Sequence, residues 1–415
     1  MRKSSLILPG STSLFTPYIG HLSAYASANT LTNLIGDLYA AIDVVSRELV
    51  GMIPSVTRNV SAERAAVGQP VTWHVTPKMG TFNVTPAMTV PEPADVTVGN
   101  DQFTITKSKG VEFGWTGEEQ RGLNTGAGYL SVQADLFAQG LRTLVNEMEA
   151  DLFTEAANAA VAATGTAGTT PFASTVGDSA QVRKLLDDAG ADPSDRSLVG
   201  DTSMGAALRT LANLTRANEA GTVMTLRDGE LLNLNGLSIK ESGQAARKLT
   251  FGTAASATTN TAGYAVGATV ITLASAGTGT VIAGDFISFA GDGRKYRVTA
   301  GDTDVSNGGT VTIAAPGLIQ AIPAVATAVT VARPVAGGAA VNVAFPRTAM
   351  QFAARAPALP QEGDLAIDRM LLTDPRSGMT FEVALYAGYR KIRAEVVAAW
   401  GVKAAKKESI VALLG

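Results

Sequence analysis

Apolar positions follow a helical period in two long segments of the chain. Between Asn29 and Met52 they recur every three or four residues, which predicts one amphipathic helix. The segment 128–163 predicts a longer helix, about 50 Å from end to end. Its apolar stripe consists of Leu130, Ala134, Phe137, Leu141, Leu144, Met148 and Leu152. The polar residues that fall off this stripe are Arg142, Asn146, Glu149 and Glu155.

Shorter helices and strands alternate in the middle of the chain. The run SAQVRKLLDDAGA predicts a helix that stops at Gly190. A short strand is expected over Ser197–Gly200 and another helix over Ala206–Glu219. Asn235-Gly236 separates two apolar runs within 230–240, which predicts a hairpin. This alternation favours an α/β or α+β domain.

Residues 61–100 show no helical period and are rich in proline. Their short β-prone runs predict a long two-stranded arm whose edges are blunted by proline. An arm of this length is expected to pair with a second molecule rather than fold as a loop of a compact domain. The alternating residues 101–116 that follow predict one or two strands.

Between residues 249 and 345 charged residues nearly vanish, and the pattern becomes entirely β. The predicted strands are ATVITLA, DFISFAG, KYRVTAG, GTVTIAA and ATAVTVARP. They predict a small inserted barrel or sandwich.

After residue 345 the mixed pattern resumes. Strands are expected over Met379–Tyr386, Lys391–Val397 and Trp400–Lys403, with a turn at 374–378 before the first. The apolar tail IVALL is expected to close this sheet.

Composition narrows the classes of function. The chain has 415 residues, which favours two or three domains, and only 17% of them are charged against a typical ~25%. Cysteine is absent, which excludes disulfides, thiol nucleophiles and zinc–thiolate sites. The only histidines are His21 and His74, so a histidine-rich metal centre is excluded as well. Sparse charge is unusual for a surface that faces only water, and it fits a surface that is covered by contacts.

Charge and hydropathy exclude further classes. The net charge of −3 argues against tight nucleic-acid binding through a basic face. We find no run of about 18 apolar residues, so we expect no membrane span. Pro9 and Gly10 interrupt the first apolar stretch too early for a signal peptide.

The sequence contains none of the common motifs of catalytic or cofactor-binding sites. The sequence has no phosphate-cradling loop, dinucleotide fingerprint or nucleophile elbow, so we predict no catalytic, cofactor-binding or metal-binding residues and no enzyme activity. Asp302-x-Asp304-x-Ser306 resembles a calcium loop weakly, and we interpret it as a turn because Asn307 replaces the required glycine. His74 is interpreted as a polar residue on a strand face.

Two charged clusters allow two interpretations each. Glu118-Glu119 could act as an acid/base pair, but carboxylates before a helix more often interact with its positive end. Lys391 and Arg393 share one strand face, which could contact phosphate weakly but more often is solvated or pairs with a subunit. Basic residues also recur at Lys403, Lys406 and Lys407.

The order of these parts resembles the major capsid proteins of tailed bacteriophages, in the subfamily with a β-barrel domain inserted in the capsid fold. The C-terminal block carries the most specific motifs. They are Phe345-x-Arg347-x-Ala349, the turn Asp374-Pro375-Arg376-Ser377-Gly378 and the closing Trp400-Gly401-Val402-Lys403. The run GELLNLNGLSIKES precedes the insertion.

The resemblance implies an α+β fold of the Hong Kong type with an N-terminal arm, an extended β loop and a spine helix. Its parts would be an N-terminal arm and helix (1–60), an extended loop (61–100), a peripheral domain with the spine helix (101–165), a first axial part (166–248), an inserted β-barrel (249–345), and an axial and peripheral return with the C-terminus (346–415). The extended loop would lie over a neighbouring subunit, and the insertion would face outward.

The resemblance further implies a major capsid protein that self-assembles into an icosahedral shell around packaged double-stranded DNA. Its partners would be copies of itself in hexameric and pentameric capsomers, a scaffolding protein, a portal and loosely held DNA, with no membrane and no cofactor. It would be found in the virion after procapsid maturation, having assembled in the host bacterial cytoplasm. The alternatives are an encapsulin-like nanocompartment shell and a secreted β-rich surface or adhesin protein. The missing signal peptide and the long helix weigh against the secreted protein.

Overall fold

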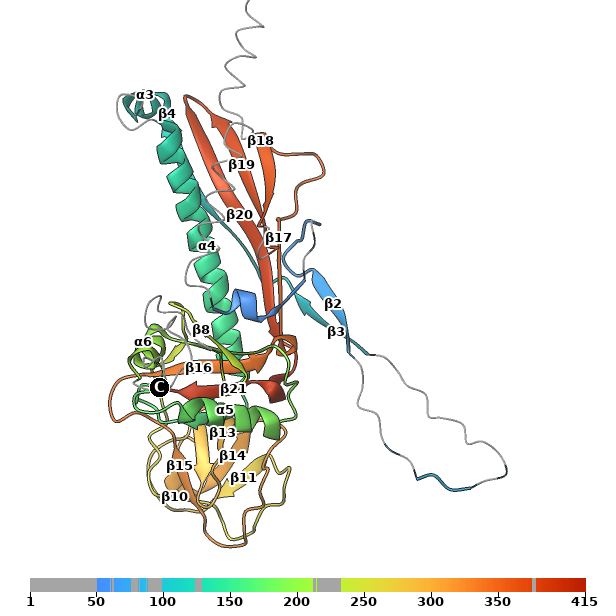
Figure 1. The fold of residues 1–415 in the computed structure, drawn as a ribbon, viewed down its shortest axis with the longest axis vertical. Coiled ribbons are helices and arrows are strands. Elements are labelled where there is room, and N and C mark those ends of the chain that lie inside the picture. The colour runs from blue at the N-terminus through green and yellow to red at the C-terminus, as the bar shows by residue number, and fades with distance from the viewer. Residues whose placement is uncertain are drawn as a thin grey trace, which may run out of the picture.

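The computed structural model describes residues 51–59, 61, 63–75, 81, 83–86, 88, 99–123, 129–211, 214, 233–374 and 378–415. These residues form a mixed α+β structure with mostly strands, elongated along helix α4 (Tyr129–Ala159) (Figure 1). Most of the predicted helix Asn29–Met52, and His21, lie outside these residues.

Helix α4 confirms the strongest helical pattern in the sequence. The stripe residues Phe137, Leu141 and Met148 are fully buried, as the 3.6-residue period predicts. The predicted end at residue 163 is wrong, because β5 (Ala162–Gly165) instead pairs with a strand near the C-terminus. Glu149, which falls off the apolar stripe, is nevertheless fully buried.

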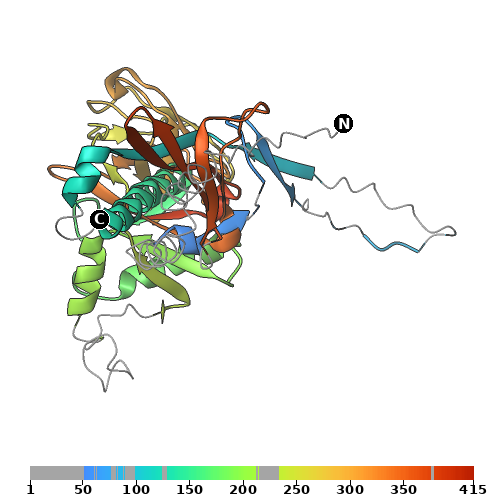
Figure 2. The same ribbon diagram turned by 90° about the horizontal axis from the view of Figure 1, so that it is seen from above.

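The first sheet lies against α4 along its length (Figures 1 and 2). Its strands are β1 (Thr57–Asn59), β4 (Lys107–Thr116), β17 (Met350–Arg355), β18 (Ala366–Thr373), β19 (Thr380–Gly388) and β20 (Lys391–Ala404). Strand β20 is central, because Val397 pairs with Gly110 of β4 on one side and with Glu382 of β19 on the other. The two strands predicted over 391–403 are therefore one continuous strand, since both of its edges carry partners.

The second sheet crosses the lower end of α4 (Figure 1). Here β16 (Ala339–Pro346) lies between β6 (Arg196–Gly200) and β21 (Val411–Leu414), and β21 also pairs in parallel with β5. The apolar tail thus joins this sheet and does not close the C-terminal meander, which corrects the sequence prediction. The segment predicted to end at residue 345 ends inside β16.

Turn and capping residues in the local sequence explain the hairpin and the two short helices between residues 177 and 241. The predicted hairpin is confirmed as β7 (Asn233–Leu234) and β8 (Leu237–Glu241), whose turn residues Asn235 and Gly236 both have positive φ. Helix α5 (Gly177–Asp188) also confirms its prediction. Helix α6 (Thr202–Thr210) begins earlier than predicted, because the side chain of Asp201 accepts a hydrogen bond from the Met204 N–H and caps the helix. It ends at Thr210, where Leu211 is extended, and most of the rest of the predicted span up to Glu219 lies outside the described residues.

The predicted strands within 249–345 are present and enclose a core of their own. They are β11 (Val270–Leu273), β12 (Phe286–Phe289), β13 (Lys295–Ala300), β14 (Gly309–Ile313) and β15 (Ala328–Val331), with the short β9 (Arg247–Lys248) and β10 (Ala257–Thr258) before them. The strands follow one another in the order β10-β15-β12-β13-β14-β11. A bridge between Thr259 and Leu273 then joins the two ends of this series.

The arm predicted over 61–100 begins and ends in a strand pair. Strand β2 (Pro70–Val75) pairs with β3 (Gly99–Thr104) in antiparallel register, which confirms a two-stranded base. The pair extends away from the body of the molecule (Figures 1 and 2). Residues 76–80 and 89–98 lie outside the described part of the chain.

The 3-10 helices and the remaining short α-helix complete the described elements. They are α3 (Gly117–Leu123), η2 (Ile53–Ser55), η3 (Val305–Asn307), η4 (Arg347–Ala349) and η5 (Lys407–Ser409).

Candidate interaction surfaces

The base of the β2–β3 arm is fixed to the first sheet by a small core. Val71, Phe103 and Ile105 are buried there against Ala353 and Ala399. Farther out, described positions between the two strands carry the exposed apolar side chains of Val84 and Met88. The arm is thus anchored at one end and presents apolar surface at the other.

Lys403 of β20 provides a polar clamp on the same base. Its Nζ lies 2.8 Å from Asp101 Oδ1 and donates to the Gln102 carbonyl at 2.9 Å. The same ammonium lies 5.3 Å from the ring centroid of Trp73, within cation–π range. The hydrogen bond from Lys403 lowers the pKa of Asp101, so the contact favours the charged form of that carboxylate.

A buried carboxylate holds the segment that leads into the arm. Glu382 of β19 is 2% exposed and pairs with Arg64, whose guanidinium also donates to the Pro357 carbonyl at 2.8 Å. On its other side the carboxylate lies 2.5 Å from Nε of Arg369 in β18. A buried charge of this kind is retained only when it is paired, and here two cations share it.

Glu149 connects helix α4 to residues 51–53 by hydrogen bonds. Its carboxylate accepts hydrogen bonds from the backbone N–H groups of Gly51 and Met52 at 2.6 Å and of Ile53 at 3.0 Å. Gly51 and Met52 precede η2 and Ile53 begins it, so these N–H groups have no partner within the helix. Burial raises the pKa of Glu149, and the surrounding donors oppose that effect.

Strand β18 presents an apolar edge to solvent. It pairs only with β19 among the described strands. Leu365, Ile367 and Leu371 on or beside it are exposed, Ile367 by 59%. Unpaired edges with apolar side chains are surfaces on which another chain can add.

A surface hollow of about 830 Å³ lies at the tip of the same sheet. The exposed ring of Tyr389 and the side chains of Arg390 and Lys391 line it, together with residues of β4 and α3. Arg393, in contrast, pairs with Glu112 and Glu395. The Lys391–Arg393 face is therefore partly neutralised within the chain, which favours the pairing or solvated interpretation over a phosphate contact.

The other sequence candidates have structural partners. Glu119 accepts a 2.8 Å hydrogen bond from the Thr116 N–H while Thr116 Oγ1 accepts one from the Glu119 N–H, which is a capping box at the start of α3. These bonds lower the pKa of Glu119. Asp302 and Asp304 accept from the backbone N–H groups two residues later, as turn residues do. His74 Nδ1 lies 2.7 Å from Asn100 Oδ1 across the β2–β3 pair.

Among the described residues, no three side chains of the metal-binding types gather closely enough to hold a metal ion. Within the same residues, no helix combines the length and apolarity that crossing a bilayer requires.

Sequence patterns missed the buried charges of this structure. Glu149, Glu382 and Asp285 contact partners that are distant in sequence, and no local spacing marks them. Glu382 and Asp285 stand inside β-prone segments, whereas Glu149 lies on a helix between Glu147 and Asp151, where nothing in the local sequence distinguishes it.

No protein-family profile and no curated protein matches this chain. Among solved structures it is similar to one from Mycobacterium phage Che8, with 14% identity, a TM-score of 0.43 and coverage of 83% of this chain and 84% of that one. It is also similar to the capsid of cyanophage P-SCSP1u, with 11% identity, a TM-score of 0.43 and coverage of 86% of both chains. A virus-like particle from Pyrococcus furiosus is similar at 10% identity and a TM-score of 0.40, over 91% of this chain and 98% of that one. At low identity, the chain is thus similar to chains from solved phage capsid structures.

Proposed function

We propose that this chain is a major capsid protein that self-assembles into a closed icosahedral shell around double-stranded DNA, as in tailed bacteriophages. The observation that carries the proposal is the β2–β3 arm. Its base is fixed by Val71, Phe103 and Lys403, while Val84 and Met88 remain exposed beyond it. An arm built in this way gains stability when a second subunit covers it.

Two further features support assembly. The edge strand β18 carries exposed apolar residues, and the whole chain has few charges for its size. A shell subunit makes several different contacts with its copies, and low charge lets those surfaces approach one another. The proposed role is therefore structural and needs no catalytic residue.

The roles that we propose for the individual segments follow from the sequence resemblance. Residues 61–100 would lie over a neighbouring subunit, 166–248 and 346–400 would surround the capsomer centres, and 249–345 would be an inserted barrel on the outside. The closed strand order from β10 to β11 supports the barrel interpretation. We further propose a scaffolding protein and a portal as partners, and assembly in the host cytoplasm.

Production of the full chain, alone and together with a candidate scaffolding protein, tests this function. Negative-stain microscopy should show closed particles tens of nanometres wide. Dispersed monomers under all assembly conditions would contradict self-assembly. Particles that enclose a protein cargo and no DNA would instead identify a nanocompartment shell.

A further inference from the structure

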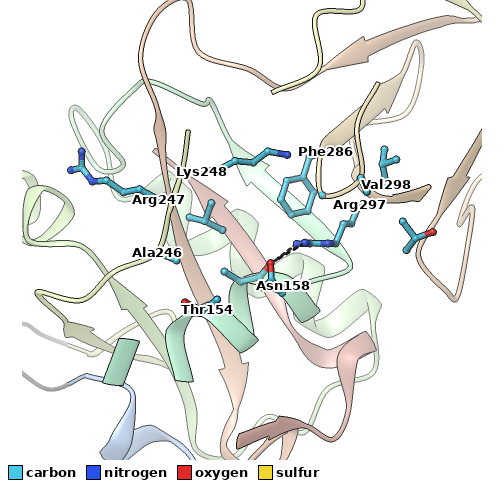
Figure 3. A pocket seen from close by; sticks show the side chains of 13 residues that line it. Thr154, Asn158, Ala246, Arg247, Lys248, Phe286, Arg297 and Val298 are labelled. Carbon is cyan, nitrogen blue, oxygen red and sulfur yellow. Dashed lines mark hydrogen bonds between the residues drawn. The ribbon is translucent and has the colours of Figure 1, made fainter. Parts of the chain in front are cut away.

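A cavity of about 580 Å³ lies where helix α4 meets the β-rich segment 249–333 (Figure 3). Its walls come from the end of α4, from β9, and from β12 and β13. Lys248, Phe286 and Arg297 extend toward one region of it, whereas Arg247 points away (Figure 3). Arg247 instead lies 3.7 Å from the carboxylate of Asp201.

Two cationic nitrogens converge on Gly284 in this cavity. An atom at the position of a Cβ on Gly284 would lie 3.4 Å from Arg297 Nη2 and 3.7 Å from Lys248 Nζ. Apart from the glycine and its chain neighbours, no other described atom lies within 4 Å of that position. Because Gly284 has no side chain, there is an open space next to it that the side chains of both Lys248 and Arg297 reach.

Arg297 carries a positive charge that no described acidic side chain neutralises. Its guanidinium donates to the Ala157 carbonyl and, at 3.3 Å, to Asn158 Oδ1. Both acceptors are neutral and belong to the end of α4. Burial lowers the pKa of Arg297, which means that the surroundings disfavour the charge that this guanidinium keeps.

Lys248 is paired with Asp285, whose carboxylate is shared with two backbone N–H groups. Asp285 is fully buried and accepts from Lys248 Nζ at 2.6 Å, from the Gly252 N–H at 3.0 Å and from the Ile282 N–H at 2.9 Å. Burial lowers the pKa of Lys248, the hydrogen bond and the charge of Asp285 oppose that effect, and the nearby Arg297 acts in the same direction as burial. The two cations thus repel each other across an open space, and an anion between them would relieve that repulsion.

We propose that this cavity binds a phosphate group between Lys248 and Arg297. A phosphate offers several oxygens, so one can face each cation with charge-assisted hydrogen bonds. The bound group would join the end of α4 to the segment 249–333. This site is independent of shell assembly, so either proposal can fail while the other stands.

Asn158→Asp tests the site without removing any cation. The substitution preserves the size and the oxygen acceptor of the side chain while placing a carboxylate beside Arg297. That carboxylate would compete with a bound phosphate from within the protein. Asn233→Asp, on an exposed residue of β7, is the matched control with the same change of charge outside the cavity.

Isothermal titration of the full chain with inorganic phosphate, in chloride buffer of constant ionic strength, measures the affinity. We expect Asn158→Asp to weaken phosphate binding about tenfold or more, and Asn233→Asp to change it less than about twofold. Absence of binding to the unmodified chain, or equal binding by the two variants, overturns the proposal.

A second titration with a short DNA duplex identifies the source of the phosphate. Duplex binding that Asn158→Asp weakens by a similar factor supports a backbone phosphate as the ligand. Binding of inorganic phosphate alone supports a free anion. Circular dichroism of both variants verifies that they are folded.

Discussion

The carboxylate of Glu149 accepts a 2.6 Å hydrogen bond from the backbone N–H of Met52, which lies 97 residues earlier in the chain. The contact is fully buried and lies in the C-terminal half of helix α4. It fixes the point at which the N-terminal segment enters the fold.

Replacing Glu149 with alanine should destabilise the protein by about 3 kcal/mol or more, because three buried N–H groups lose their acceptor. Glu149→Gln keeps one acceptor oxygen and should cost less. Urea unfolding followed by circular dichroism measures both values. Equal, small losses for the two variants would show that these hydrogen bonds contribute little.

The same residue predicts a pH dependence. Because burial raises the pKa of Glu149, the native state binds this proton more tightly than the unfolded state does. The resulting stability is present at low pH and is lost as the pH rises from the ordinary carboxyl range through the raised pKa. Unfolding at a series of pH values should show this loss in the unmodified protein and not in Glu149→Gln.

Glu382 gives a second prediction about buried charge. Glu382→Ala leaves Arg64 and Arg369 without their shared carboxylate, and we expect a loss of about 3–5 kcal/mol. Glu362→Ala, an exposed position in the chain before β18, is the control and should change stability by less than about 0.5 kcal/mol. Limited proteolysis should cleave the Glu382→Ala variant sooner near Arg64. Equal cleavage of the two variants would contradict an anchoring role.

Lys403→Met should loosen the base of the arm. The variant loses the contacts with Asp101 and Trp73, so amide exchange in β2 and β3 should become faster while α4 stays protected. Because the pKa of Asp101 is lowered, this residue stabilises the folded arm at pH values above the ordinary carboxyl pKa, and that stabilisation is lost as the pH falls. Once the intrinsic pH dependence of amide exchange is divided out, the protection of the unmodified arm should therefore fall on acidification, and that of Lys403→Met should change little.

A substitution on the exposed apolar edge of β18 should impair assembly without impairing folding. Ile367→Lys should leave the unfolding free energy within about 0.5 kcal/mol, since the side chain is 59% exposed. It should nevertheless reduce particle yield, because a neighbouring subunit that packs on this edge would bury the charge of the lysine in an apolar contact. Thr373→Lys, exposed on the same strand, is the matched control. Normal particle yield from Ile367→Lys would exclude this edge from subunit contacts.

Elements that depend on nearby residues could be predicted from the sequence. The stripe from Phe137 to Leu152 identified α4, and Asn235-Gly236 identified the β7–β8 turn. Both signals rest on contacts between residues at most four positions apart, where spacing alone determines which side chains share a face.

Elements that depend on distant pairing could not be predicted in this way. Ala162 continues a helical pattern, yet it pairs with Val411 and forms a strand. Glu149 lies beside the apolar stripe, and only the arrival of residues 51–53 explains its burial. The cavity between Lys248 and Arg297 likewise forms from segments that no local pattern connects.

The position of β21 has a consequence for synthesis of the protein. Residues 411–414 fill the place between β5 and β16, so neither neighbour has its full set of backbone partners until those residues leave the ribosome. Contacts between such distant positions form late in folding. A chain interrupted before residue 411 would leave one edge of β5 and one edge of β16 without a partner strand, and only a subunit translated to this point can complete its second sheet.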